Sequence, residues 1–190
     1  MENVKNAFNP LPVVVGITGH RDIPSEATAA LEEQVEAQIL HIKKLYPHCP
    51  VLVLSSLAEG ADRLCARAAL KTGSRLHVPL PMPREEYEKD FDEASLAEFS
   101  ELLSRADSVF VVEAMEQAPN SGPSRGYFYR QAGLYIVERA HVLIALWDGE
   151  EAVGADSGGT FETVDLMRRN NGVICHIPTP RQSGPAMESC

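Results

Sequence analysis

Three short segments place glycines and polar side chains directly after apolar runs and directly before helical patterns. In the first, Gly16-Ile-Thr-Gly-His-Arg21, Gly19 permits a tight turn, and His20 and Arg21 follow where a phosphate or ribose would lie. The motif is neither a GxGxxG fingerprint nor a P-loop, which would require a lysine after its glycine. The alternative is a plain turn at Gly19, with Arg21 solvated or paired to a carboxylate.

The second segment, Ser55-Ser-Leu-Ala-Glu-Gly-Ala-Asp62, connects an apolar run to a helix that begins at a glycine. The start of a helix offers unpaired N–H groups and the positive end of the helix dipole, so it binds a phosphate with little help from side chains. Glu59 can contact ribose hydroxyls, and Asp62 can instead cap the helix. The alternative is a simple turn whose small residues serve packing. The candidate ligand-binding residues here are Ser55, Ser56, Glu59, Gly60 and Asp62.

The third segment runs from Asp148 to Glu162 and is rich in glycine and acidic residues. Its Ser157-Gly-Gly-Thr160 portion opens another helix and predicts a second anion site, to which the Thr160 hydroxyl adds a donor. Glu162 lies in the first helical turn, where a carboxylate also simply favours the helix dipole. The candidate ligand-binding residues of this segment are Asp148, Gly158, Gly159 and Thr160.

Aromatic and charged residues near these segments give further candidates. Tyr129 and Arg130 begin a helix after the long polar loop 113–125, and Trp147 ends an apolar run. An aromatic ring there can stack on a base, but ordinary core packing explains it equally well. The charged stretch Arg84–Asp92 is typical of a solvated helix face.

The elements that must position these residues alternate along the chain. Apolar, β-branched runs predict strands at 13–18, 51–54, 76–80, 108–112, 141–147 and 172–177, and apolar residues at helical spacing predict helices at 25–46, 60–72, 84–91, 94–103, 127–140 and 160–170. This pattern indicates an α/β fold: a Rossmann-like, doubly wound, mostly parallel sheet of about six strands with helices on both faces. We expect a leader at 1–11, one domain at 12–178 and a flexible tail at 179–190.

Parallel strands bring all three segments to one edge of the sheet. Ligands of open parallel sheets bind beyond the carboxyl ends of the strands, where the strand order reverses. We therefore expect the candidate residues to meet in one site at that edge.

Composition and charge narrow the partners. The chain has 190 residues and a net charge of −10, which argues against avid binding to nucleic acid. The longest apolar runs have the length of strands, and the first residues lack the pattern of a secretory signal, so we expect a cytoplasmic protein without a membrane partner. The four cysteines form no CxxC pair and no zinc-site spacing, so we expect reduced thiols and no metal site.

The three segments together resemble the SLOG superfamily of Rossmann-like nucleotide-binding domains over residues 12–178. The middle segment is similar to the Ser-Gly-x-Ala-x-Gly-x-Asp junction of the DNA-processing protein A family, with its first glycine absent here. The last segment is similar to the Pro-Gly-Gly-x-Gly-Thr-x-x-Glu signature of the Lonely Guy phosphoribohydrolases, in shortened form. The chain is most similar to uncharacterised bacterial members that carry TGHR, EGADR, ALWDG and GGT elements.

This resemblance implies binding or sensing of a nucleotide or nucleotide-derived ligand, with no certain cofactor beyond it, and a homo-oligomer. It also implies an alternative, a nucleoside-monophosphate phosphoribohydrolase or related N-glycosidase, with Glu162 as the catalytic carboxylate and Arg130 or Arg21 holding the phosphate. In that branch the carboxylate stands three residues after the motif threonine, which is Thr163 here; Glu162 is rotated from it by about 100° on the helix. A non-catalytic interaction module is the third alternative.

Overall fold

The computed structural model describes residues 10–120, 122–151 and 159–182, and within them six parallel strands form one sheet in the order β4-β3-β2-β1-β5-β6. The fold class predicted from the sequence is therefore confirmed. The strands are β1 (Val13–Gly19), β2 (Val51–Leu54), β3 (Arg75–Leu80), β4 (Ser108–Val111), β5 (Val142–Trp147) and β6 (Val173–Pro178).

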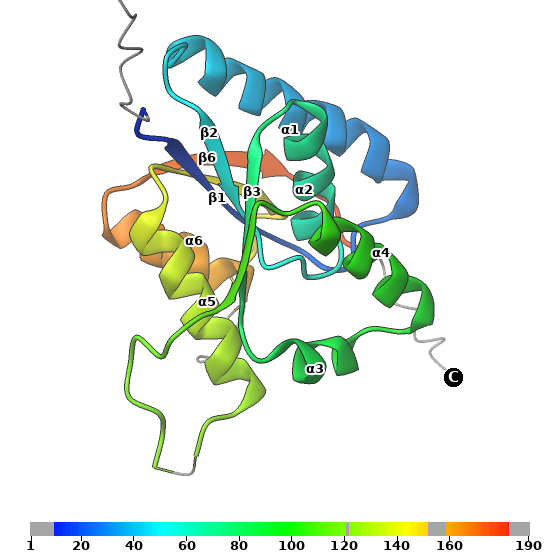
Figure 1. Ribbon diagram of the computed structural model, residues 1–190, viewed down its shortest axis with the longest axis vertical. Coiled ribbons are helices and arrows are strands. Elements are labelled where there is room, and N and C mark those ends of the chain that lie inside the picture. The colour runs from blue at the N-terminus through cyan, green and yellow to red at the C-terminus, as the bar shows by residue number, and fades with distance from the viewer. Residues whose placement is uncertain (1–9, 121, 152–158, 183–190) are drawn as a thin grey trace, which may run out of the picture.

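The helices lie on both faces of this sheet. In Figure 1, α1 and α2 cover one face, with α4 against α2, while α5 and α6 cover the other. Each strand therefore connects to the next through a helical crossover, as parallel pairing requires. The helices are α1 (Ser25–Leu45), α2 (Ala61–Lys71), α3 (Arg84–Tyr87), the 3-10 turn η1 (Glu88–Asp90), α4 (Glu93–Ser104), α5 (Arg125–Arg139) and α6 (Thr160–Arg169).

The central strands are apolar along their whole length because both of their faces are buried. All four residues of β2 are buried, and Val15 and Ile17 of β1 and Ile144 of β5 are almost fully excluded from solvent. The edge strand β4 instead leaves Val109 and Val111 exposed on one face of the sheet, while Ser108 and Phe110 on the other face are partly buried. Central position, rather than composition alone, decides which strands are closed to water.

The core consists of one apolar cluster on each face of the sheet. On the first face, Leu31, Val35 and Ile39 of α1 recur at helical spacing and pack toward α2, whose alanines allow a close approach. On the second face, Ile136 of α5 and Met167 of α6 pack on β5. Two filled faces hold the sheet rigid, so that the loops at its edges can serve as a site.

The strand order places a switch point between β1 and β5. From β1 the chain builds β2, β3 and β4 outward on one side, and it then returns to build β5 and β6 on the other. The loops that leave β1 and β5 therefore turn to opposite faces of the sheet and leave a crevice between them. The segment after β6 reaches this place, because the Gln182 N–H donates to the carbonyl of Asp22 at 2.6 Å.

No helix in the described part of the chain combines the length and the apolar character needed to cross a membrane.

Candidate functional site

A cavity of about 500 Å³ opens at the carboxyl ends of β1 and β5, at the switch point of the sheet. Its walls come from the loops after β1, β2 and β5, from the middle of α5 and from the first turn of α6, with α3 and residue Arg181 at its margins. Its size is within the usual range for small-molecule sites. The cavity lies at the edge of the sheet where the sequence predicts the site.

Most of the residues predicted to bind a ligand line this cavity. They are Gly19, His20, Arg21, Ser56, Asp62, Tyr129, Trp147, Asp148, Gly159 and Thr160. Five other predicted residues do not line it: Ser55, Glu59, Gly60, Arg130 and Glu162. Gly158 lies outside the described residues.

The loop after β1 is fastened to the loop after β5. A side chain at Gly19 would collide with Ala61, and its Cβ would lie 2.6 Å from the Leu146 carbonyl oxygen, so only glycine fits there. The Nε2 atom of the buried His20 ring lies 3.1 Å from both the backbone nitrogen and the carboxylate of Asp148. The glycine and the histidine therefore fix the floor of the cavity.

The Asp148 carboxylate is held in its ionised form. Partial burial alone would raise its pKa, but the N–H of Glu150 and the His20 side chain outweigh that effect and leave the pKa below its ordinary value. Asp148 therefore contributes a permanent negative charge and hydrogen-bond acceptors to the cavity near neutral pH.

The first N–H of α2 is paired within the chain itself. The Ala61 N–H donates to the His20 carbonyl at 3.0 Å. Gly60 has φ +71°, and a Cβ there would meet the carbonyl oxygens of His20 and Arg21, the latter at 2.5 Å. Gly60 therefore serves the close approach of two loops, and a phosphate bound at this helix start would have to displace the His20 carbonyl.

Asp62, in the first turn of α2, brings an acceptor of the chain itself to this helix start. Its carboxylate accepts from the Ala58 N–H at 3.3 Å, and the Ser55 hydroxyl donates to its backbone carbonyl at 3.0 Å. Burial raises the pKa of Asp62 to about 6, although the Ala58 N–H and the nearby Arg21 guanidinium both act to lower it. Ser55 is thus structural, whereas Asp62 is a buried carboxylate at the wall of the cavity.

Arg21 and Tyr129 form the opposite wall. The guanidinium of Arg21 lies 4.8 Å from the centre of the Tyr129 ring, a cation–π arrangement, and the Tyr129 hydroxyl donates to Asp90. Tyr129 is presented by α5, whose start is capped by the Ser124 hydroxyl accepting from the Tyr127 N–H at 3.1 Å. Arg21 therefore has a fixed aromatic support.

Glu162 and Arg130 meet each other outside the cavity. Arg130 forms ion pairs with both Glu162 and Glu116, the latter at 2.8 Å. One position further along α6, Thr163 lines the cavity instead. The residue that faces the cavity at this turn is therefore a threonine, and the two residues predicted as catalytic are brought together without reaching it.

Trp147 lines the cavity although its side chain is nearly buried. Its indole N–H donates to the Glu150 carbonyl at 3.2 Å, and its ring lies 6.2 Å from that of Phe161. The two rings form an apolar patch at the end of β5, suited to the face of a base.

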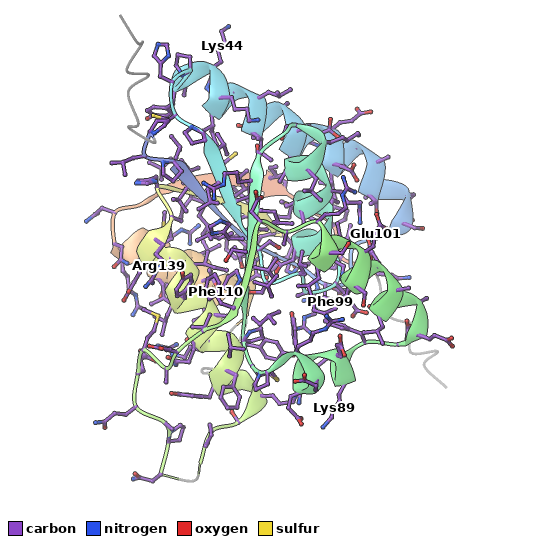
Figure 2. All side chains as sticks on the ribbon, in the orientation of Figure 1. Lys44, Lys89, Phe99, Glu101, Phe110 and Arg139 are labelled. Carbon is purple, nitrogen blue, oxygen red and sulfur yellow. The ribbon has the colours of Figure 1, made fainter. Side chains whose placement is uncertain are left out.

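Tyr87 is the main lining residue that the sequence missed. The stretch Arg84–Asp92 was expected to be solvated, but Tyr87 is 0% exposed and packs on Phe91 and on Phe99 of α4, which points into the space between α4 and α3 in Figure 2. Most of the charged residues of this stretch are exposed, as expected, but the expectation missed the inner side of the short turn, where Tyr87 lies. Tyr87 and Phe91 are four residues apart, a spacing that places both on one face of a helical turn and indicates that this face is buried.

The charged side chains around the cavity are mostly acidic. Two arginines, Arg21 and Arg181, stand against five carboxylates, Asp22, Asp62, Asp148, Glu150 and Glu151. Arg181 is itself bound to Asp22 at 3.0 Å. A ligand anion must therefore depend on backbone N–H groups, which α6 offers at Gly159–Thr160.

No protein-family model matches this chain, and no curated protein sequence matches it. Among solved structures, DNA processing protein A (DprA) from Streptococcus pneumoniae is similar, with a TM-score of 0.56 and 15% identity over 94% of this chain and 52% of that one. The Moco carrier protein of Chlamydomonas rheinhardtii has a TM-score of 0.47 and 14% identity over 88% of this chain and 76% of that one. This chain spans about half the length of DprA. The likeness shows a Rossmann-type α/β fold, distantly similar to that of DNA processing protein A.

Proposed function

We propose that this chain is a SLOG-type domain that binds or senses a nucleotide or nucleotide-derived ligand in the cavity between β1 and β5. The observation that carries the proposal is the meeting of three glycine-containing loops at the switch point, around a cavity of about 500 Å³. Sites of this kind are where open parallel sheets bind nucleotides. The motifs of the three loops support placement in the superfamily.

The proposed ligand lies with its phosphate at the start of α6. There the first-turn N–H groups and the Thr160 hydroxyl bind the phosphate oxygens, and Arg21 offsets the charge. The base lies against Trp147 and Phe161, whose rings are adjacent. This arrangement uses one helix start, because the His20 carbonyl accepts from the first N–H of α2.

The hydrolase alternative gains no support from the geometry. In the hydrolase branch that the last segment resembles, the catalytic carboxylate stands three residues after the motif threonine. Thr163 lines the cavity at the corresponding place, and Glu162 forms an ion pair with Arg130 away from it. Binding without turnover is therefore the function we propose.

A thermal-shift screen against nucleoside mono-, di- and triphosphates, NAD, ADP-ribose and cyclic nucleotides tests the proposal, with chromatography of each mixture afterwards. A ligand at 100 times its Kd stabilises the fold by about 2.7 kcal/mol, which raises Tm by several degrees. We expect such a shift with the ligand recovered intact.

The matched variants are Arg21→Gln, at the cavity, and Arg105→Gln, an exposed arginine at the end of α4. The first should reduce the shift and the second should leave it unchanged. No shift with any compound would refute nucleotide binding, and release of free base would make the protein a hydrolase.

A further inference from the structure

The hydroxyl of Tyr87 is buried at the cavity wall with no hydrogen-bond partner among the described residues. The ring itself is well placed, since it packs edge-on against Phe91 at 5.0 Å, Phe99 at 5.7 Å and Tyr129 at 6.1 Å between ring centres. Packing therefore explains the ring of Tyr87 but leaves the hydroxyl unexplained, and an unpaired buried hydroxyl costs free energy.

Neighbouring tyrosines show that this chain does pair its buried hydroxyls. Tyr129, on the same cavity, donates to Asp90, and Tyr127 donates to the Glu116 carbonyl at 2.7 Å. Tyr87 lies in contact with Tyr129 and yet differs from it in this respect. The natural partner of its hydroxyl is therefore a group that enters the cavity.

Asp62 lines the same cavity as Tyr87 and offers an acceptor there. It is 8% exposed and accepts from the Ala58 N–H. Burial raises the pKa of the Tyr87 hydroxyl. The Asp62 charge raises it further, while the Arg21 charge lowers it. Tyr87 thus remains a protonated donor near neutral pH, on the same cavity as a carboxylate that accepts.

We propose that Tyr87 and Asp62 together bind the 2′,3′-hydroxyl pair of a ribose, with Tyr87 donating to one hydroxyl and Asp62 accepting from the other. This inference rests on the proposed nucleotide binding and names the part of the ligand that enters this end of the cavity.

The chemistry of the pair favours a diol over other groups. A phosphate or carboxylate presents no donor to Asp62 and is repelled by its charge, and an ammonium group presents no acceptor to Tyr87. A hydroxyl is both donor and acceptor, so two adjacent hydroxyls satisfy both side chains at once. Carboxylates in nucleotide-binding α/β folds bind ribose hydroxyls in the same way.

The test compares ligands and variants by titration calorimetry. The ligands are AMP, GMP, CMP and UMP and their 2′,3′-dideoxy counterparts; the proteins are the wild type, Tyr87→Phe and the control Tyr46→Phe, a tyrosine exposed at the far end of α1. The wild type and the control should bind at least one ribonucleotide about tenfold or more tightly than its dideoxy form. Tyr87→Phe should lose most of that ratio and bind the dideoxy form unchanged.

A second measurement separates this role from a structural one. Since the hydroxyl has no internal partner, Tyr87→Phe should melt at the same temperature as the wild type or higher. A lower Tm, or an equal loss of affinity for both ligand forms, would overturn the subsite. Equal binding of ribo and dideoxy forms by the wild type would also overturn it while nucleotide binding stands. If no nucleotide binds, the proposed function fails, and the subsite fails with it.

Discussion

The substitution Gly60→Ala should severely destabilise the fold, whereas Gly73→Ala should cost little. Both glycines have positive φ, at +71° and +65°. An added Cβ at Gly73 meets nothing within 4 Å, but at Gly60 it meets the backbone carbonyls of His20 and Arg21. Strain of the main chain costs about 1–2 kcal/mol at either site. The collision at Gly60 adds about 1–3 kcal/mol, because backbone atoms cannot move aside as a side chain can.

We therefore expect a loss of about 4 kcal/mol for Gly60→Ala and about 1–2 kcal/mol for Gly73→Ala in the free energy of unfolding. For a chain of this length, these losses correspond to falls in Tm of about 8–16 °C and about 2–8 °C, respectively. Urea unfolding followed by circular dichroism measures both without any ligand. Equal losses at the two sites would refute the assignment of Gly60 to loop packing, and so would a Gly60→Ala variant as stable as the wild type.

Three further predictions concern charge and chemistry at the cavity. Burial raises the pKa of the Asp62 carboxyl from 3.8 to about 6, so its ionisation opposes folding of the wild type as pH rises from about 4 to 6. Over this range Asp62→Asn should therefore become more stable than the wild type by about 2–3 kcal/mol. A stability difference in urea unfolding that does not change with pH would contradict this. AMP, GMP, CMP and UMP should be recovered without free base by chromatography after long incubation, because Thr163 and not Glu162 lines the cavity. In Mg²⁺-free buffer a nucleoside monophosphate should bind more tightly than its triphosphate, since five carboxylates line the cavity; calorimetry showing the reverse would place more cationic groups at the phosphates.

The elements were predictable because their signals are local. The β-branched run at Val13–Gly19 and the glycines and prolines that follow each run mark strands and their ends, and the structure places these within a residue or two of expectation. Parallel pairing then brings the carboxyl ends of β1 and β5 to one edge, so the meeting of their loops also follows from the sequence. The meeting of these loops depends only on which strands are neighbours in the sheet, and not on the direction of any side chain.

The direction of individual side chains was not predictable in this way. On α6, one residue of rotation separates Thr163, which lines the cavity, from Glu162, which turns to Arg130; only packing against α5 decides between them. Similarly, the burial of Tyr87 depends on Phe99, which arrives from another helix. A motif at a helix start therefore does not show which of its residues face the site until the rotation of that helix about its axis is known.

The pairing of the first N–H of α2 and the acidity of the cavity lead to the same requirement on the ligand. Two helix starts flank the switch point, and the sequence alone treats them as equal anion sites. At α2 the His20 carbonyl accepts from the Ala61 N–H, and the Asp62 carboxylate accepts from the Ala58 N–H in the preceding loop, so acceptors of the chain itself stand at this helix start. One anion position remains, at α6, and the carboxylates around it oppose a second charge. A ligand with a single phosphate and several hydroxyls meets both requirements. Its phosphate takes the anion position at α6, and its neutral hydroxyl groups can donate to the carboxylates that would repel a second phosphate.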